Sequence, residues 1–221
     1  MPRTLYPFGF GQILEVKLYR AGSTIPSALT GTVTMSTALV LIDLQNDYFP
    51  GGAMELVGAK AAVAQAAKLV HTFRQSALPI FHVQHIATRV GATFFLPGTT
   101  GADIHDAVSP DEGETVVVKH FPNSFRETTL HDLLRAAKAS KLVLAGMMTH
   151  MCVDTTVRAA TDFGYQCFLA GDACATRDLQ FSTEHVKARD VQLAYLAALS
   201  GTFAAVKSTP ELCRESWRSE S

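Results

Sequence analysis

Hydrophobic positions along the chain follow two alternating patterns from residue 38 onward. Short continuous apolar runs, typical of strands buried on both faces of a sheet, occur over residues 39–44, 79–83, 115–118, 141–145, 166–170 and 203–206. Apolar residues at helical spacing occur over residues 59–76, 130–139, 152–163 and 184–199. Strand and helix therefore alternate, which predicts an α/β fold. We expect a single Rossmann-like three-layer domain in which helices flank a mainly parallel six-stranded sheet.

The two ends of the chain depart from this pattern. Residues 1–35 are rich in Pro, Gly, Ser and Thr, and only residues 13–19 show any alternation. We expect an extension that is either partly disordered or upstream of a true start at Met35, with a transit peptide as a third option. The predicted domain covers residues 36–212, and residues 213–221 are expected to form a C-terminal tail.

The longest interruption of the pattern covers residues 86–114. Loops of this length without regular structure are uncommon and usually carry function. Within the interruption, Phe94, Phe95 and Leu96 form an apolar cluster. The cluster indicates either a lid over a binding site or a contact between subunits.

Composition and charge limit the classes of partner. The 221 residues are 48% hydrophobic and 18% charged, with a formal net charge of −1, so the chain lacks the basic surface that binds nucleic acids and anionic membranes. No apolar run approaches the ~20 residues that cross a bilayer. Four cysteines without CxxC spacing, in a chain without a recognisable secretory signal, indicate reduced thiols and a cytoplasmic setting.

Three reactive side chains occur where predicted strands end. Asp43 ends the first apolar run, Lys119 follows the third, and Cys152 follows the fourth at the start of a predicted helix. The carboxyl ends of parallel strands meet at one edge of a sheet, so these side chains are expected to converge on one pocket. The free N–H groups and positive dipole end of the helix near Cys152 favour its thiolate.

Structural roles are the alternative for each of these three residues. A lone cysteine is often a buried core residue. Asp43 and Lys119 could form a structural ion pair, although buried pairs are weak evidence for stability. Their convergence favours catalysis. In that hypothesis Asp43 is the general base, Lys119 stabilises the negative charges, and Cys152 attacks an electrophilic carbon.

Four segments between about Ser36 and Leu212 resemble the isochorismatase-like cysteine hydrolases, a superfamily that includes nicotinamidases and N-carbamoylsarcosine amidohydrolase. The segments are ALVLIDLQNDYF, VVVKHFPNSF, GMMTHMCVDTTVRAA and GDACAT. Together they occur in the order and spacing of the family and cover most of the chain.

The resemblance implies specific roles for residues of this chain. Asp43, Lys119 and Cys152 correspond to the catalytic triad of the family. A cis peptide bond is implied between Met147 and Met148. The N–H groups of Met148 and Cys152 would form the oxyanion hole, which stabilises a tetrahedral intermediate.

Departures from two subgroups of the family narrow the expected reaction. Isochorismatases proper lack the nucleophilic cysteine, so Cys152 counts against vinyl-ether hydrolysis. Nicotinamidases carry a metal-binding DxHxxxH segment, whereas this chain reads FHVQHIATRV at that point. Strand alternation places His82 and His85 on opposite faces, and too few further ligands are expected nearby for a metal site. We therefore predict no metal and no other cofactor, with one of these histidines in the pocket and the other in the core.

The predicted activity is that of a metal-independent cysteine hydrolase. It would cleave a C–N bond, in an amide or carbamoyl group of a small molecule, through a covalent thioester, with water as the second substrate. The alternatives are an isochorismatase-type vinyl-ether hydrolase and a non-catalytic binding protein with the same fold. The resemblance also implies a homo-oligomer.

Further pocket residues are predicted from their positions close to the triad in the sequence. For the aromatic residues among them, ordinary core packing is the alternative. The candidates are Gln45, Phe49, His85, Ser124, Phe125 and His150.

Overall fold

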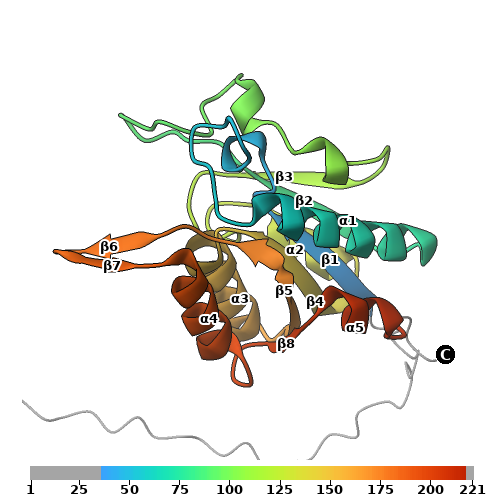
Figure 1. The fold of residues 1–221 in the computed structure, drawn as a ribbon. Helices are drawn as coiled ribbons and strands as arrows, with labels where there is room; N and C mark the ends of the chain where they lie inside the picture. Colours follow the sequence, from blue (N-terminus) through green and yellow to red (C-terminus); the bar gives the residue numbers. More distant parts are fainter. Residues whose placement is uncertain (1–35, 218–221) are drawn as a thin grey trace, which may run out of the picture. The chain divides into compact units, whose positions relative to one another are not determined.

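In the computed structural model, which describes residues 36–217, six strands form one sheet in the order β3-β2-β1-β4-β5-β8, and each neighbouring pair is parallel (Figure 1). The strands are β1 (Ser36–Ile42), β2 (Ile80–His85), β3 (Thr115–Lys119), β4 (Ala139–Met147), β5 (Gln166–Ala175) and β8 (Ala205–Lys207). The predicted α/β fold with a six-stranded sheet is confirmed. The extension expected over residues 1–35 lies outside the described residues.

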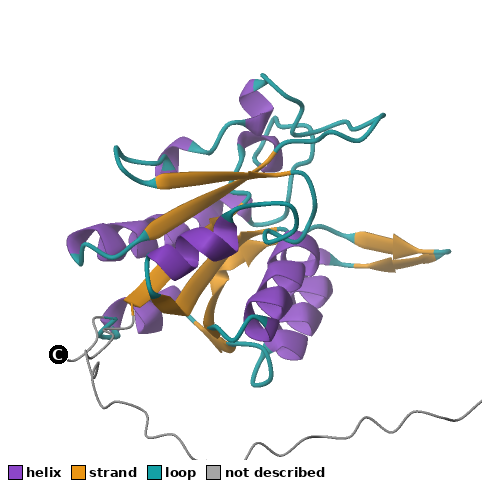
Figure 2. Cartoon of the chain, turned by 180° about the vertical axis from the view of Figure 1, so that it is seen from behind, coloured by secondary structure: helices purple, strands orange, loops and turns teal. Residues whose placement is uncertain are grey.

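Helices cover both faces of the sheet, as the two opposite views in Figures 1 and 2 show. One face carries α1 (Ala59–Gln75) and α5 (Thr209–Arg214), and the other carries α2 (Leu130–Ala136), α3 (Asp154–Asp162) and α4 (Ala188–Leu199). Alternate residues of β1 point to opposite layers. Leu39 and Leu41 join the core under α1, whereas Val40 and Ile42 join the core under α2 and α3. Since both faces are covered, an apolar residue is favoured at every position of this strand.

Short helical turns occupy the loops. They are η1 (Asn46–Tyr48) after β1, η2 (Thr100–Ala102) and η3 (Asp106–Val108) in the long loop over residues 86–114, and the π-helical turn η4 (Thr149–Val153) before α3. In the part of the chain that the structure describes, every helix is too short or too polar to span a bilayer.

The helix predicted over residues 184–199 begins later than expected. Residues 184–186 instead form β7 (Glu184–Val186), which pairs antiparallel with β6 (Leu179–Phe181), and the helix starts at Ala188. Ser182, between the two strands, adopts a left-handed φ of 54°, which lets the chain reverse tightly there. Figure 1 shows this hairpin extending away from the sheet.

The folded unit also continues past residue 212, where a tail was expected. α5 begins with a capping box between Ser208 and Glu211. Further on, Trp217 is buried against Phe73 of α1 and Phe168 of β5, with ring centroids 6.4 and 5.0 Å apart. These partners are distant in the sequence, so a local pattern does not reveal them.

A partly buried hydrogen-bond cluster fastens the far end of the long loop to the sheet. Glu114 accepts hydrogen bonds from Arg74 Nε at 2.7 Å and from the backbone N–H of Asp111 at 3.0 Å, and His82 Nε2 lies 2.8 Å from its carboxylate. Burial raises the pKa of Glu114, but these partners outweigh burial and lower it to about 2. Burial of His82 lowers its pKa, so the ring is neutral near pH 7.

Gly146 is required where β4 passes β1, and Gly146→Ala should destabilise the fold. The residue has a φ of 143°, and a Cβ at this position would overlap the backbone oxygen of Ile42. We expect a loss of about 3 kcal/mol in the free energy of unfolding, measured by chemical denaturation. Gly171→Ala is the control, since its Cβ would meet only flexible side chains at 3.2 Å. Equal stability of the two variants would contradict this role.

Protonation of His82 should contribute to acid destabilisation. Its pKa is lowered in the folded state, so the unfolded state binds the proton more readily and stability falls as the pH drops below about 6.5. His82→Gln should remove on the order of 1 kcal/mol of the stability change between about pH 7.5 and 5.5. The measurement is urea denaturation across that range, with the exposed His71→Gln as control. A pH dependence that is unchanged in His82→Gln would contradict the prediction.

Candidate active site

The reactive residues lie at the point where the strand order of the sheet reverses. The chain runs from β1 through β2 to β3 on one side, and β4 then returns to the other side of β1. Asp43 follows β1 and Cys152 follows β4, so they flank the crevice in which open α/β sheets bind ligands. Lys119 is the last residue of β3, which β2 and β1 separate from β4.

Asp43 and Lys119 form an ion pair that is fully buried. Lys119 Nζ lies 2.8 Å from Asp43 Oδ2, and both side chains are 0% exposed. Lys119 also donates to the backbone oxygens of Phe121 and Pro122 at 3.2 and 3.0 Å. Burial alone would lower the pKa of Lys119, but the negative charge of Asp43 raises it. Among the described residues neither carboxylate oxygen of Asp43 has a hydrogen-bond partner, and Oδ1 also lies outside the ion pair with Lys119, which leaves it available to accept a proton.

Cys152 lies beside this pair, inside the π-helical turn η4. The side chain is buried, and its Sγ lies within 4.8 Å of both an Asp43 carboxylate oxygen and a His85 ring nitrogen. Burial raises the pKa of the thiol and the Asp43 carboxylate raises it further, while Lys119 opposes both effects. The expectation that the helix end favours a thiolate is therefore wrong for the resting site. The stable form is a protonated thiol next to a carboxylate that can accept its proton.

His85 completes the group of side chains around the thiol. Its Nδ1 lies 3.9 Å from Asp43 Oδ2, and burial lowers its pKa, so the ring is neutral at pH 7. Asp43, His85 and Cys152 thus bring three potential metal ligands together, more than the sequence led us to expect. The Lys119 ammonium already occupies the space next to Asp43, and its charge opposes the binding of a cation there.

Two other predicted pocket residues have structural roles instead. Gln45 Nε2 donates to the backbone oxygens of His85 and Ala102, both at 2.8 Å, and its Oε1 accepts from the His85 N–H at 2.7 Å. These bonds occupy its amide group. Ser124 is buried, and its Oγ accepts a hydrogen bond from Thr156 at 2.8 Å. Both residues hold neighbouring segments together, so we no longer assign them to substrate binding.

The three remaining candidates each have contacts with other side chains. Phe125 packs into an aromatic cluster with Phe163, at a centroid distance of 5.1 Å. The hydroxyl of Thr176 and Nδ1 of His150 lie 2.5 Å apart at the end of β5. The ring of Phe49 lies against that of His105, with centroids 4.0 Å apart and planes tilted by 39°.

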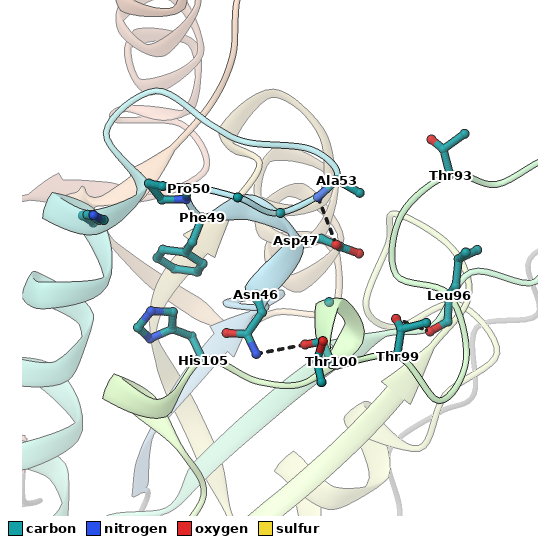
Figure 3. A pocket seen from close by; sticks show the side chains of 14 residues that line it. Asn46, Asp47, Phe49, Pro50, Ala53, Thr93, Leu96, Thr99, Thr100 and His105 are labelled. Carbon is teal, nitrogen blue, oxygen red and sulfur yellow. Dashed lines mark hydrogen bonds between the residues drawn. The ribbon is translucent and has the colours of Figure 1, made fainter.

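Phe49 lines a surface cavity of about 770 Å³ that none of the triad residues lines. Figure 3 shows this cavity between the segment after β1 and the long loop, with the Phe49 and His105 rings side by side. Its lining residues are Asn46, Asp47, Phe49, Pro50, Gly51, Gly52, Ala53, Lys60, Thr93, Leu96, Thr99, Thr100, Gly101 and His105.

Two aromatic residues near the site were not predicted as pocket residues. Phe95 is fully buried, with its ring 4.6 Å from that of Tyr48 and 5.8 Å from that of His85. Burial raises the pKa of Tyr48, and the charge of Asp43 adds to this effect. The apolar cluster in the long loop was the available signal for Phe95. No sequence signal indicated Tyr48, apart from its position five residues after Asp43.

The backbone before Cys152 has the conformation that the resemblance implied. The peptide bond between Met147 and Met148 is cis. The backbone oxygen of Met148 accepts hydrogen bonds from the N–H groups of Met151 and Val153, at 3.0 and 3.2 Å. The turn that carries Cys152 is therefore fastened directly to the end of β4.

Comparison with known proteins gives close relatives. The chain is 50% identical over 175 residues to the uncharacterized isochorismatase family protein YddQ of Bacillus subtilis, covering 79% of this chain and 97% of that protein. It is 36% identical over 174 residues to the secreted isochorismatase effector Isc1 of Verticillium dahliae, covering 79% and 90%. A crystal structure from Oleispira antarctica superposes with a TM-score of 0.79 at 49% identity, covering 88% of this chain and 100% of that one.

More distant relatives have hydrolase names. They include a streptothricin hydrolase of Streptomyces noursei, 32% identical over 142 residues that cover 64% of this chain and 50% of that protein. A maleamate amidohydrolase of Pseudomonas putida is 29% identical over 154 residues, covering 63% and 72%. Residues 37–201 match the family model described as the isochorismatase domain. Fold, sequence and relatives agree, and the chain belongs to the isochorismatase family of hydrolases.

Proposed function

We propose that the protein is a metal-independent cysteine hydrolase that cleaves a C–N bond in an amide or carbamoyl group of a small molecule. The observation that carries the proposal is the buried thiol of Cys152 beside a carboxylate with one unpaired oxygen, which Lys119 pairs on its other oxygen. This arrangement is that of a nucleophile, its base and a positive charge paired with the base. The names of the streptothricin hydrolase and the maleamate amidohydrolase support the same class of reaction.

The first half of the reaction forms a thioester. Asp43 takes the thiol proton as Sγ of Cys152 attacks the carbonyl carbon, and the carbonyl oxygen becomes an oxyanion. The N–H groups of Met148 and Cys152 are its proposed hydrogen-bond donors. The C–N bond then breaks as Asp43 returns the proton to the leaving nitrogen, which departs as ammonia or an amine. The acyl group remains on sulfur.

The second half releases the acid by hydrolysis. Water attacks the thioester carbon while Asp43 accepts its proton, and Sγ of Cys152 leaves as the tetrahedral intermediate collapses. The proton then returns from Asp43 to the sulfur, which restores the resting thiol. Between these transfers the Lys119 ammonium, 2.8 Å from Asp43 Oδ2, attracts the negative charge of Asp43 in a buried site. The raised pKa of the thiol means that proton transfer accompanies attack rather than preceding it.

Replacement of the nucleophile or the base should abolish turnover. We expect Cys152→Ser and Asp43→Asn each to lower kcat/KM by about 10³-fold or more, because both groups act in the same step. The measurement is ammonia release over a panel of small primary amides and ureido acids. Cys167→Ser is the control, since this buried thiol lies near the start of β5, at the other end of the strand from the edge of the sheet that carries the triad. With a vinyl-ether substrate assayed separately, retained turnover in Cys152→Ala with loss in Asp43→Ala would instead identify vinyl-ether hydrolysis.

Asp43→Asn should make the Cys152 thiol easier to ionise even though it removes activity. The Asp43 carboxylate raises the thiol pKa, so its removal should shift alkylation of Cys152 by iodoacetamide to lower pH. The measurement is the pH dependence of the alkylation rate at Cys152, followed by mass spectrometry. The exposed Asp103→Asn is the charge-matched control. A profile that stays in place or moves to higher pH would show that Asp43 does not act on the sulfur.

A further inference from the structure

The long loop places one aromatic ring against the reactive group. Phe95 is 0% exposed, whereas the next residue, Leu96, is 38% exposed. Its ring stands edge-on to Tyr48 and also lies beside His85, which is itself 3.9 Å from Asp43. The loop thus packs against His85, one of the side chains that surround the thiol. Because Cys152 is only 4% exposed, movement of a neighbouring segment would widen access to its sulfur.

The side chain of Asp47 holds this part of the loop in place. Its Oδ2 accepts a hydrogen bond from the Phe95 N–H at 2.6 Å, and its Oδ1 accepts one from the Ala53 N–H at 3.1 Å. Figure 3 shows Asp47 between the segment after β1 and the long loop, with its bond to Ala53. Gly101, further along the loop, passes so close that a Cβ there would overlap the carboxylate. One carboxylate therefore joins three separate stretches of backbone.

The held conformation is one that the loop would not adopt by itself. Phe95 has a left-handed φ of 56°, which is strained for a bulky residue and persists only where the surroundings enforce it. The hydrogen bond from its N–H to a charged acceptor is of the stronger kind. On the outer side, Asp47 and Leu96 line the cavity of about 770 Å³, so the loop is backed there by open space rather than by packed core.

We propose that Asp47 is a positioning residue that keeps Phe95 as a removable wall of the substrate site. Opening of the Asp47–Phe95 hydrogen bond lets the loop move outward and exposes Cys152. Reclosure brings the Phe95 ring against the bound substrate and fixes it for attack. The substrate would then carry an apolar group on the side that faces Phe95. This inference rests on the proposed function for the identity of the reaction, but the gating itself can be measured without turnover.

Asp47→Asn is the direct test, with Cys152 as the reporter. An amide keeps one acceptor oxygen but turns an NH₂ group toward the second N–H, so one of the two bonds is lost. The probes are iodoacetamide and a bulky maleimide, with labelling rates at each cysteine followed by mass spectrometry. The ratio of the two rates cancels the thiolate fraction and reports access alone. We expect the maleimide-to-iodoacetamide ratio at Cys152 to rise about tenfold.

Two controls separate gating from general loosening of the fold. Cys167 is also buried, but it lies under α3 near the start of β5, away from the strand ends that carry the triad. Its labelling rates should therefore stay the same in the same sample. Asp103→Asn removes an exposed charge from the same loop and should behave as wild type.

Phe95→Leu is a second test of the gate. It shortens the side chain without changing the Asp47 carboxylate, and it should also raise the maleimide-to-iodoacetamide ratio at Cys152. An unchanged ratio in both Asp47→Asn and Phe95→Leu, or an equal rise at Cys167, would overturn the proposal.

Turnover distinguishes this proposal from the proposed function. With an active substrate, Asp47→Asn should raise KM about tenfold while kcat changes much less, because a looser wall weakens binding before chemistry. A fall in kcat at unchanged KM would overturn the positioning role. If no Cys152-dependent turnover exists but the labelling ratio still rises, the proposed function fails and the gate stands. If turnover depends on Cys152 but neither labelling nor KM responds, the gate fails and the proposed function stands.

Discussion

The buried ion pair between Asp43 and Lys119 is the interaction on which the rest of the site depends. An isolated charge at this depth would cost several kcal/mol, so each residue requires the other. Their contact fixes the ends of β1 and β3 relative to each other, with β2 between them. It also leaves one carboxylate oxygen unpaired, and Cys152 lies close to that carboxylate. The same burial that pairs the charges keeps the thiol protonated until a substrate arrives.

Three polar residues at alternate positions after β1 have three different tasks. Asp43 takes part in the proposed chemistry. Gln45 links the end of β2 to the long loop through His85 and Ala102, with its hydrogen bonds filled on both sides. Asp47 joins the loop at Phe95 to its own segment. Residues 43–47 therefore supply both Asp43 and the hydrogen bonds, from Gln45 and Asp47, that hold the long loop in a fixed conformation beside it.

Most of the fold could be predicted from the sequence because strands and helices are encoded by patterns of neighbouring residues. Apolar runs and helical spacing identified the strands, the helices and their alternation, and alternation fixes a parallel sheet. The exceptions have physical causes. The hairpin of β6 and β7 depends on a tight turn at Ser182. The burial of Trp217 depends on partners in α1 and β5, far away in the sequence. Neither leaves a clear periodic pattern.

For the site, the sequence by itself determined which residues end their strands, and therefore that Asp43, Lys119 and Cys152 meet at one edge of the sheet. Only the tertiary structure decided the environment of each group. Proximity follows from strand order, but the thiol pKa depends on burial and on the carboxylate beside it, which reversed the effect expected from the helix end. In the same way, the hydrogen bond of Gln45 to His85 and the packing of Phe95 beside His85 were not predictable, since hydrogen-bond partners and packing neighbours are set by folding rather than by sequence spacing.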